Sequence, residues 1–568
     1  MTSIIRKTKG KKAYYYAVES KRVDGKPRIV WQKYLGTLDD IVRKCTSHPG
    51  NVAEVDIFSA GGVAAMLRVA QKLSLIDIID KEVPKRDQGA SVGQYIVLAA
   101  INRILDPCSK LQMPEWYQQT VLHRLWKLPD TCFTSQMFWN HMDLINEKNI
   151  DNIQEAVTQK LIQDFGIDPS GLLYDTTNFF TYVATGNNRN TIAKRGKNKA
   201  KRNDLRQVGL ALLVSKDFQI PLFHKVYQGD RPDRGLFVKM ADDLVETQNK
   251  LFCGAKDTTL VFDKGNVSED AMHRLIIGGK HYVCAVPKTT NFELYSTSIE
   301  KMEIVQGLPG TRAYIKEIDV WSKKHKAVVA YSESFFASEM ADLMDKLRKI
   351  EEKLHDLDLW LKHGPQRSRD EKHYSQVNIK RKIKTILSYP RAEEVMDVKI
   401  IKLDNKYRLE YGINQKKLNN MMENELGRTL ILSTRLEWNS DEIISNYRSQ
   451  QGIENVFRHM KNKDYLHWQP EFHWTDSKIK IHGLYCVLAM LLASLAHREI
   501  VRNGLNLSLI EMLDELNGVR EVALIYNESS TKKQKGMKSK KNQLVMSRMS
   551  SSQKKLTEVL EVQLVLRG

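Results

Sequence analysis

The apolar and polar positions of the chain divide it into stretches of different period. Near the N-terminus, two runs rich in aromatic and β-branched residues, "AYYYAVES" and "RIVWQKYLG", flank Asp24-Gly25, which is a strong hairpin signal. From Asp56 to Phe165 the apolar residues mostly follow a helical period, interrupted by turn residues. We therefore predict a β-hairpin followed by a helical region, in which no stretch specifies a DNA-recognition helix.

After Leu172 the pattern changes to short apolar strands. "LLYDTTNFFTYV" and "TTLVFDKGN" are each typical of a buried strand that carries one acid, Asp175 in the first and Asp263 in the second. Further strands are predicted at "QVGLALLVS", "IPLFHKVYQG" and "HYVCAVPK", and helices from Arg234 to Phe252 and from Val267 onward. This order of strands and helices favours an α/β fold built around one mixed sheet.

The regular order breaks between Thr289 and Asn439, where hairpin-like strands surround a charged helical stretch. A helix is then predicted over "NYRSQQGIENVFRHMK", residues 446–461, with Ser440 or Asn439 as its N-cap. Tyr447, Glu454 and Lys461 are each seven residues apart, so a continuous helix would place them on nearly one face. This face would carry a single acid among basic and aromatic groups.

Composition limits the partners that the chain can have. Of 568 residues, 42% are hydrophobic and 27% are charged, which is typical of a globular protein. The formal net charge of +20 favours a polyanionic partner, with nucleic acid preferred over an anionic membrane.

Cysteine spacing and hydropathy bear on the compartment. The six cysteines lie far apart without a CxxC pair, which opposes a zinc module or a disulfide framework. The first residues lack the apolar core of a signal peptide, and the apolar run from Gly483 to Ala496 is too short to span a bilayer. We expect this run to be a buried core helix, and the protein to be cytoplasmic, nucleoid-associated and free of membrane contacts.

Three acids are candidates for chemistry. Asp175 and Asp263 each end an apolar strand, where a carboxylate is costly unless it is hydrogen-bonded or binds a metal, and Glu454 follows on the predicted helix. Taken singly, each acid has an alternative role as a cap or a salt-bridge partner. Three converging carboxylates would suit hard divalent cations, and two metals about 3.5–4 Å apart support phosphoryl transfer.

These motifs resemble those of the DDE transposases, and more narrowly of the insertion-sequence-four group. That group's third acid lies in the pattern Tyr, two residues, Arg, three residues, Glu, six residues, Lys, which Tyr447, Glu454 and Lys461 match. Gln450 departs from the pattern at the Arg position, and Arg458 is a substitute for the missing contact. "YDTTNFF" and "DKGN" are similar to the group's first and second acid motifs.

The resemblance implies an α/β fold with a ribonuclease-H-like catalytic core that is interrupted by a mixed α/β insertion. A β-hairpin and an α-helical DNA-binding region would precede the core. The expected divisions are a hairpin segment at 1–55, the helical region at 56–168, the first part of the core at 169–288, the insertion at 289–439, the second part of the core at 440–528 and a basic tail at 529–568.

The resemblance also implies an activity. Asp175, Asp263 and Glu454 would bind two Mg²⁺ ions, with Mn²⁺ as a possible substitute, and Tyr447, Gln450, Arg458 and Lys461 would contact DNA. The expected reaction is cleavage at transposon ends and strand transfer into target DNA, carried out by a homodimer in the DNA complex. The partner would be double-stranded DNA, both the inverted-repeat ends and the target. Two alternatives stay open, a metal-dependent nuclease that does not join ends and a non-catalytic DNA-binding protein derived from a transposase.

Overall fold

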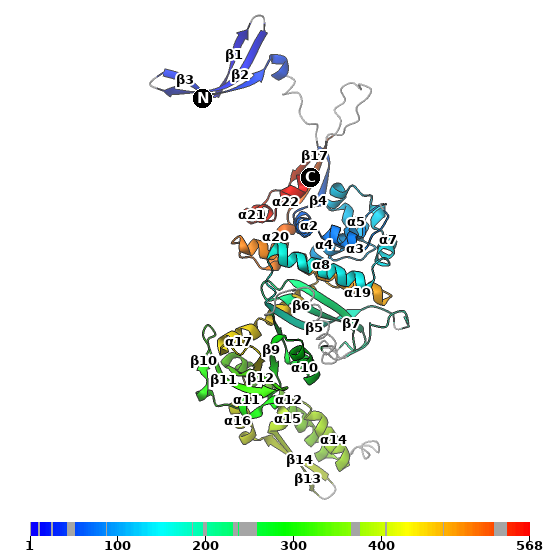
Figure 1. The fold of residues 1–568 in the computed structure, drawn as a ribbon, viewed down its shortest axis with the longest axis vertical. Helices are drawn as coiled ribbons and strands as arrows, with labels where there is room; N and C mark the ends of the chain where they lie inside the picture. Colours follow the sequence, from blue (N-terminus) through cyan, green and yellow to red (C-terminus); the bar gives the residue numbers. More distant parts are fainter. Residues whose placement is uncertain are drawn as a thin grey trace.

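A computed structural model describes most of the chain. The described residues are 2–9, 12–23, 26–41, 52–86, 88–184, 186–196, 202–230, 237, 258–364, 375–403, 406–469, 471–526 and 542–567. The predicted helix from Arg234 to Phe252 lies outside them apart from Phe237, as do the tip of the N-terminal hairpin and residues 527–541. Along the longest axis, an N-terminal sheet is followed by a helical body, a large sheet and a projecting arm (Figure 1).

The large sheet has nine strands in the order β10-β11-β12-β15-β9-β8-β5-β6-β7. The strands β5, β6 and β7 form an antiparallel meander, β8 and β9 continue parallel to β5, and β15 returns antiparallel to β9. This mixed sheet agrees with the α/β fold predicted from the strand order. The strand bounds are β5 (Gly171–Thr181), β6 (Arg206–Ser215), β7 (Pro221–Gln228), β8 (Thr259–Phe262), β9 (His281–Val286), β10 (Glu303–Ile304), β11 (Thr311–Val320), β12 (Lys323–Ser332) and β15 (Arg428–Ser433).

The helical body lies between the large sheet and the N-terminal sheet. At its centre is α19 (Asp476–Arg502), which packs against α4, α2 and β7. By length and composition α19 is the one helix among the described residues that could cross a membrane, but 94% of its apolar window is buried inside the protein. It is therefore the expected core helix, although it is longer than the apolar run predicted. The other helices are α2 (Gly61–Lys72), α3 (Leu75–Glu82), α4 (Val92–Leu105), α5 (Met113–Gln118), α6 (Leu122–Trp126), α7 (Ser135–Met142) and α8 (Glu147–Phe165).

The C-terminal residues fold onto this body, which corrects the prediction of a basic tail at 529–568. Strand β17 (Asn542–Met546) pairs with β16 (Arg520–Tyr526), and β16 also pairs with β4 (Val52–Ser59). Helix α20 (Leu509–Asn517) precedes β16, and α21 (Ser551–Val559) and α22 (Val562–Arg567) follow β17, with α20 and α22 against α2. Leu556, Leu560 and Val562 are buried in the main core, and this apolar spacing outweighs the Lys- and Ser-rich composition of the segment.

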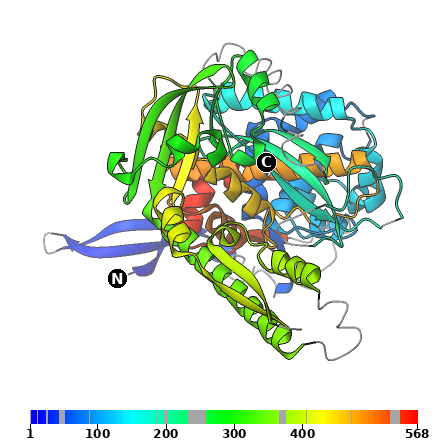
Figure 2. The ribbon, with the colours of Figure 1, turned by 90° about the horizontal axis from the view of Figure 1, so that it is seen from below.

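The predicted insertion, 289–439, is only partly a separate unit. Strands β10, β11, β12 and β15 extend the large sheet, because β15 pairs directly with β9. The remainder forms an arm with its own hydrophobic core, which projects from the sheet (Figure 2). The arm consists of α12 (Glu333–His363), α14 (Gln376–Ile386), α15 (Ala392–Val395), β13 (Met396–Leu403), β14 (Lys406–Ile413) and α16 (Gln415–Asn424).

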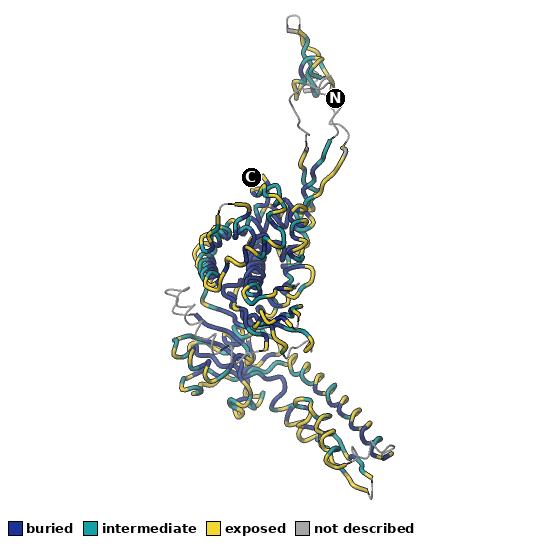
Figure 3. Tube along the Cα trace, turned by 90° about the vertical axis from the view of Figure 1, so that its right-hand side faces the viewer, coloured by how far each residue is buried: buried dark blue, intermediate teal, exposed yellow. Residues whose placement is uncertain are grey.

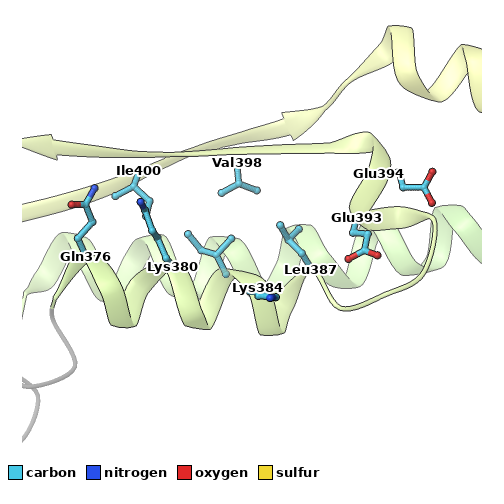
Figure 4. A pocket seen from close by; sticks show the side chains of 9 residues that line it. Gln376, Lys380, Lys384, Leu387, Glu393, Glu394, Val398 and Ile400 are labelled. Carbon is cyan, nitrogen blue, oxygen red and sulfur yellow. The ribbon is translucent and has the colours of Figure 1, made fainter.

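The extent of burial differs between these units. Figure 3 shows buried residues concentrated in the helical body and the large sheet, while the arm and the N-terminal sheet are largely exposed. A shallow pocket lies between α14 and β13 of the arm, where Lys380 and Lys384 line one side and Val398 and Ile400 the other (Figure 4).

Candidate active site

Asp175 lies on β5, and Asp263 follows directly after the end of the neighbouring strand β8. Strand β5 runs parallel to β8, with Leu173 opposite Val261; Asp175 comes two residues after Leu173, and Asp263 comes two residues after Val261. The backbone of Asp263 continues the extended conformation of β8, with φ −83° and ψ 161°. Because a step of two residues preserves the face of a strand, this register directs both carboxylates to one face of the sheet. The prediction that Asp175 ends an apolar strand needs correction, because β5 continues to Thr181, whereas Asp263 does follow the end of β8.

Each aspartate is half-buried and has a contact that fixes its orientation. Oδ1 of Asp175 accepts a hydrogen bond of 2.7 Å from the backbone N–H of Thr176. Oδ1 of Asp263 accepts a hydrogen bond of 3.3 Å from the hydroxyl of Tyr447. Behind this pair, burial raises the pKa of the Cys284 thiol and the charge of Asp263 raises it further, so the thiol stays protonated beside the acids.

The helix predicted over residues 446–461 is broken into two. Helix α17 (Ser440–Arg448) begins after Asn439, whose side chain forms a capping box with Glu442 and so confirms one of the two predicted N-caps. Helix α18 (Gln451–Met460) begins after a tight turn in which the N–H of Gln450 bonds to the carbonyl of Tyr447. The predicted continuous helix is therefore interrupted at Ser449 and Gln450, although both residues keep right-handed helical dihedral angles.

Tyr447 and Glu454 nevertheless lie within electrostatic reach of each other across this interruption. Burial is the largest cause of the raised pKa of Tyr447, and the charge of Asp263 and, more weakly, that of Glu454 add to it. The phenol therefore lies within electrostatic reach of both acids. Helix α17 packs against β8 and β9, and α18 packs against β5, so the two helices span β5, which carries Asp175, and β8, which Asp263 directly follows.

Helix α18 lies on the face of β5 that carries Asp175. Its C-cap residue Lys461 donates a hydrogen bond of 2.6 Å to Oγ1 of Thr177, and the ammonium lies 5.3 Å from the ring centre of Phe179. Thr177 and Phe179 lie at steps of two residues from Asp175 and so share its face of β5. Glu454, which is exposed, lies two helical turns before Lys461, or about 10 Å back along the helix axis toward Asp175 and Asp263.

The turn between β6 and β7 braces the junction of α17 and α18. Nζ of Lys216 donates a hydrogen bond of 2.9 Å to Oδ1 of Asn446 in α17. Gln219, which has a positive φ of 47°, lies directly against Gly452, where an added Cβ would be 2.7 Å from Cγ of Gln219. Gly452 thus allows the approach of this turn rather than the approach of DNA.

The predicted DNA-contacting residues differ in their exposure. Arg458 and Lys461 are exposed on α18, while Tyr447 is half-buried and directed at Asp263. Gln450 is only 8% exposed at the junction between the two helices. This burial opposes a DNA contact, so the prediction for Gln450 needs correction: the residue takes part in the turn that separates α17 from α18.

The carboxylate oxygens of Asp175 and Asp263 are the kind of ligand that hard divalent cations prefer. Asp175 and Asp263 offer adjacent carboxylate oxygens, and Mg²⁺ is commonly held by one or two carboxylates together with substrate phosphates. Within the described part of the chain, no group of three or more His, Cys, Asp or Glu side chains is close enough to form a ready-made metal site. Asp175, Asp263 and Glu454, all of which the structure describes, therefore do not form a closed set of ligands.

Sequence reasoning missed a buried polar network beside the site. Glu471 accepts a hydrogen bond of 2.7 Å from Nε1 of Trp468, and Trp468 stacks on Phe179 with ring centres 4.3 Å apart. Burial raises the pKa of Glu471 to about 8 and lowers that of the nearby Lys110 to about 7. The composition of "HWQPEFHW" gave no sign that its acid is buried, because Phe179 and Lys110, which lie around Trp468 and Glu471, come from distant parts of the chain.

Comparisons with known proteins give weak likenesses. No protein-family model and no curated protein matches the chain. Among solved structures, a piggyBac transposase synaptic complex with hairpin DNA is similar over 80% of this chain and 79% of that chain, at 8% identity and a TM-score of 0.38. A Mos1 transposase paired-end complex with the left transposon end is similar over 35% of this chain and 60% of that chain, at 9% identity and a TM-score of 0.15. At these scores the likeness is coarse, so the function proposed below rests on the residues of the chain itself.

Proposed function

We propose that the protein is a DDE-type DNA transposase of the insertion-sequence-four type, which cleaves DNA at transposon ends and joins the freed ends to target DNA. The observation that carries this proposal is the placement of Asp175 on β5 and of Asp263 directly after the parallel neighbouring strand β8, with α18, which carries Glu454, packed against β5. Such a pair of acids beside a basic helix suits chemistry on a phosphodiester. The net charge of +20 favours DNA as its source.

The order of the central strands supports a ribonuclease-H-like core. An antiparallel meander, β5-β6-β7, is followed by β8 and β9, which add in parallel on the other side of β5. The first acid lies on the central strand of this unit and the second directly after the next parallel strand. The third acid comes from a helix that follows a long excursion through β10–β12, the arm and β15. This is the arrangement that the DDE resemblance implies.

The carboxylates of Asp175, Asp263 and Glu454 would hold two Mg²⁺ ions. When bound, the metal supplies Lewis-acid chemistry, lowering the pKa of an attacking water or hydroxyl and stabilising the leaving oxygen. The residues of the chain do the positioning: Tyr447 fixes one oxygen of Asp263, and the Thr176 amide fixes one oxygen of Asp175. The exposed Glu454 completes the ligand set when DNA is bound.

The basic side chains of α18 would place the DNA. Lys461 is held beside Thr177 and Phe179, at the end of α18 that lies beyond Asp175 along β5. Arg458 is exposed one turn after Glu454. Contacts from such groups to phosphates fix the register of a duplex without reading its sequence. Two ends have to meet for joining, so we propose a homodimer in the DNA complex, located with the nucleoid in the cytoplasm.

The experiment that separates the proposal from its rivals uses DNA that carries the inverted repeats flanking the coding sequence. The full-length protein is incubated with this DNA and a supercoiled target plasmid, in Mg²⁺, in Mn²⁺ and in EDTA. A transposase produces cut ends and joined products in Mg²⁺, and Mn²⁺ supports the reaction as well. Cut ends without joined products identify a nuclease. Tight binding without cutting in either metal identifies a non-catalytic DNA-binding protein.

A further inference from the structure

The N-terminal residues form a small sheet that stands apart from the helical body (Figure 1). Its three strands are antiparallel in the order β1-β2-β3, with β1 (Thr2–Lys9), β2 (Lys12–Val23) and β3 (Lys26–Gly36). The structure adds β1 to the predicted hairpin, so a three-stranded antiparallel sheet, with irregular register at Tyr15/Tyr16 and Glu19/Ser20, replaces a two-stranded ribbon. No role at the carboxylate site accounts for this sheet.

One face of the sheet is closed by its own aromatic side chains. Tyr14, Tyr16 and Tyr34 form a cluster with ring centres 5.2 and 6.1 Å apart, and Val18 beside them is only 1% exposed. Lys7 from β1 lies over the ring of Tyr16 at 4.9 Å. This face is the small core that holds the three strands together.

The opposite face is open and basic. The strand register places Arg6 opposite Tyr15, Lys33 opposite Ala17, and Arg28 opposite Lys21, all on the side away from the tyrosine cluster. The four basic side chains, Arg6, Lys21, Arg28 and Lys33, are exposed.

The same face carries an exposed aromatic side chain and an acid. Trp31 is 49% exposed and lies opposite Glu19, whose carboxylate is 3.6 Å from the ammonium of Lys21. An open face of four cations, one acid and an exposed indole is complementary to a polyanion.

We propose that this open face binds double-stranded DNA, with the sheet lying in the major groove. Three strands spaced about 4.8 Å apart place the outer strands roughly 10 Å from each other, and the major groove is about 12 Å wide. Sheets are known to enter that groove, with cations at their margins on the phosphates. Arg6 on β1 and Arg28 and Lys33 on β3 lie on the two outer strands, where they face the two phosphate backbones.

The proposal deepens the proposed function, since it assigns DNA binding to the N-terminal sheet rather than to the helical region alone. It stands on different residues from the carboxylate site, so the two can fail separately. DNA binding is measured in EDTA, where no metal-dependent cleavage occurs.

The test measures the affinity of the full-length protein for a fluorescent 30-base-pair duplex with the terminal repeat sequence, across a range of salt concentrations. The variant is Arg6→Ala/Arg28→Ala/Lys33→Ala, which leaves the tyrosine cluster intact. Its matched control is Lys301→Ala/Lys316→Ala/Lys324→Ala, which removes the same charge from exposed positions of η4 (Ile299–Lys301), β11 and β12. A charge-retaining variant, Arg6→Lys/Arg28→Lys, keeps the electrostatic contacts.

Each lost phosphate contact lowers the slope of log affinity against log salt by about 0.9. The sheet variant is therefore expected to lose between two and three units of slope, and about ten-fold or more in affinity near 100 mM salt. The control and the charge-retaining variant keep the slope of the wild type. An unchanged slope in the sheet variant, an equal loss in the control, or a preference for duplex RNA of the same sequence overturns the proposal. Loss of affinity in the charge-retaining variant as well overturns it too, because binding would then depend on the fold of the sheet and not on its charge.

Discussion

The hydroxyl of Tyr447 donates a hydrogen bond of 3.3 Å to Oδ1 of Asp263, although the two residues are 184 positions apart in the chain. This contact joins α17 to Asp263, the acid that directly follows β8. Burial raises the pKa of Tyr447 well above its usual range, and the charges of Asp263 and Glu454 raise it further. The phenol therefore stays protonated as a hydrogen-bond donor throughout the neutral range.

Replacing Tyr447 by Phe tests the positioning role of this phenol. Loss of a hydrogen bond to a charged group costs about 1.5–3 kcal/mol, so Tyr447→Phe should slow cleavage about ten-fold or more and leave DNA affinity unchanged. The matched control is Tyr465→Phe, since Tyr465 makes a similar hydrogen bond to Asp514 far from the aspartate pair. Single-turnover cleavage rates check the prediction, and equal rates for Tyr447→Phe and the wild type would contradict it.

The sequence was enough to identify the candidate acids, but it did not reveal which residues contact them. The apolar runs in "LLYDTTNFF" and "TTLVFDKGN" placed Asp175 and Asp263 at strand ends, which is correct for Asp263, while Asp175 lies inside β5. The strand order indicated one mixed sheet. That the two strands are adjacent, parallel and in register is set by tertiary pairing, which local pattern does not encode. Thr177 could have been named from the sequence, because it is the next residue on the same strand face as Asp175.

The errors have separate physical causes. The helix predicted over residues 446–461 is interrupted at Ser449 and Gln450, where the β6–β7 turn packs against the neighbouring Gly452, a tertiary contact that the local pattern does not encode. The C-terminal helices were hidden by Lys and Ser residues on their solvent faces. The strands β10–β12 were assigned to a separate insertion because nothing in their own sequence shows that β15 pairs with β9.

The contact between Gly452 and Gln219 predicts a defined steric effect. In Gly452→Ala the new Cβ would lie 2.7 Å from Cγ of Gln219, so the variant should lose about 1–3 kcal/mol of unfolding free energy despite the better helix propensity of alanine. Urea unfolding measures this loss. The second substitution Gln219→Ala should restore stability in the double variant, because it removes the atoms that clash.

A matched glycine serves as the control for this effect. Gly412 on β14 has open space around its missing Cβ, so Gly412→Ala is expected to change stability by less than about 1 kcal/mol. A Gly452→Ala variant as stable as the wild type, or a double variant that shows no recovery, would contradict the proposed brace between the β6–β7 turn and α18.

Burial of Glu471 predicts a specific pH dependence of stability. Its pKa is raised from 4.5 to about 8, mainly by burial, so the folded protein holds a proton that the unfolded chain loses near pH 4.5. The stability that this proton contributes is fully present below pH 4.5 and is lost as pH rises toward 8. Glu471→Gln removes the titration while retaining an amide oxygen for Nε1 of Trp468. Between pH 5 and 8 the wild type should therefore lose stability relative to this variant.

The measurement is urea unfolding of both proteins at several pH values, with Glu423→Gln as the control at an exposed position. The difference between wild type and control is expected to stay constant with pH. Parallel curves for the wild type and Glu471→Gln would show that Glu471 is ionised in the folded protein, contrary to the effect of its burial.

Asp175, Asp263 and Glu454 are expected to act together in cutting DNA, and amide variants of the three acids show whether each is required. Asp175→Asn, Asp263→Asn and Glu454→Gln keep the side-chain size and remove the charge that a metal requires. DNA with the element's own ends is offered in Mg²⁺, and binding is measured in parallel by anisotropy. Each variant should bind the ends as tightly as the wild type and cut at least about 1,000-fold more slowly, the loss of some 4 kcal/mol of transition-state stabilisation. Wild-type cutting by any one of the three variants would contradict the assignment of that acid.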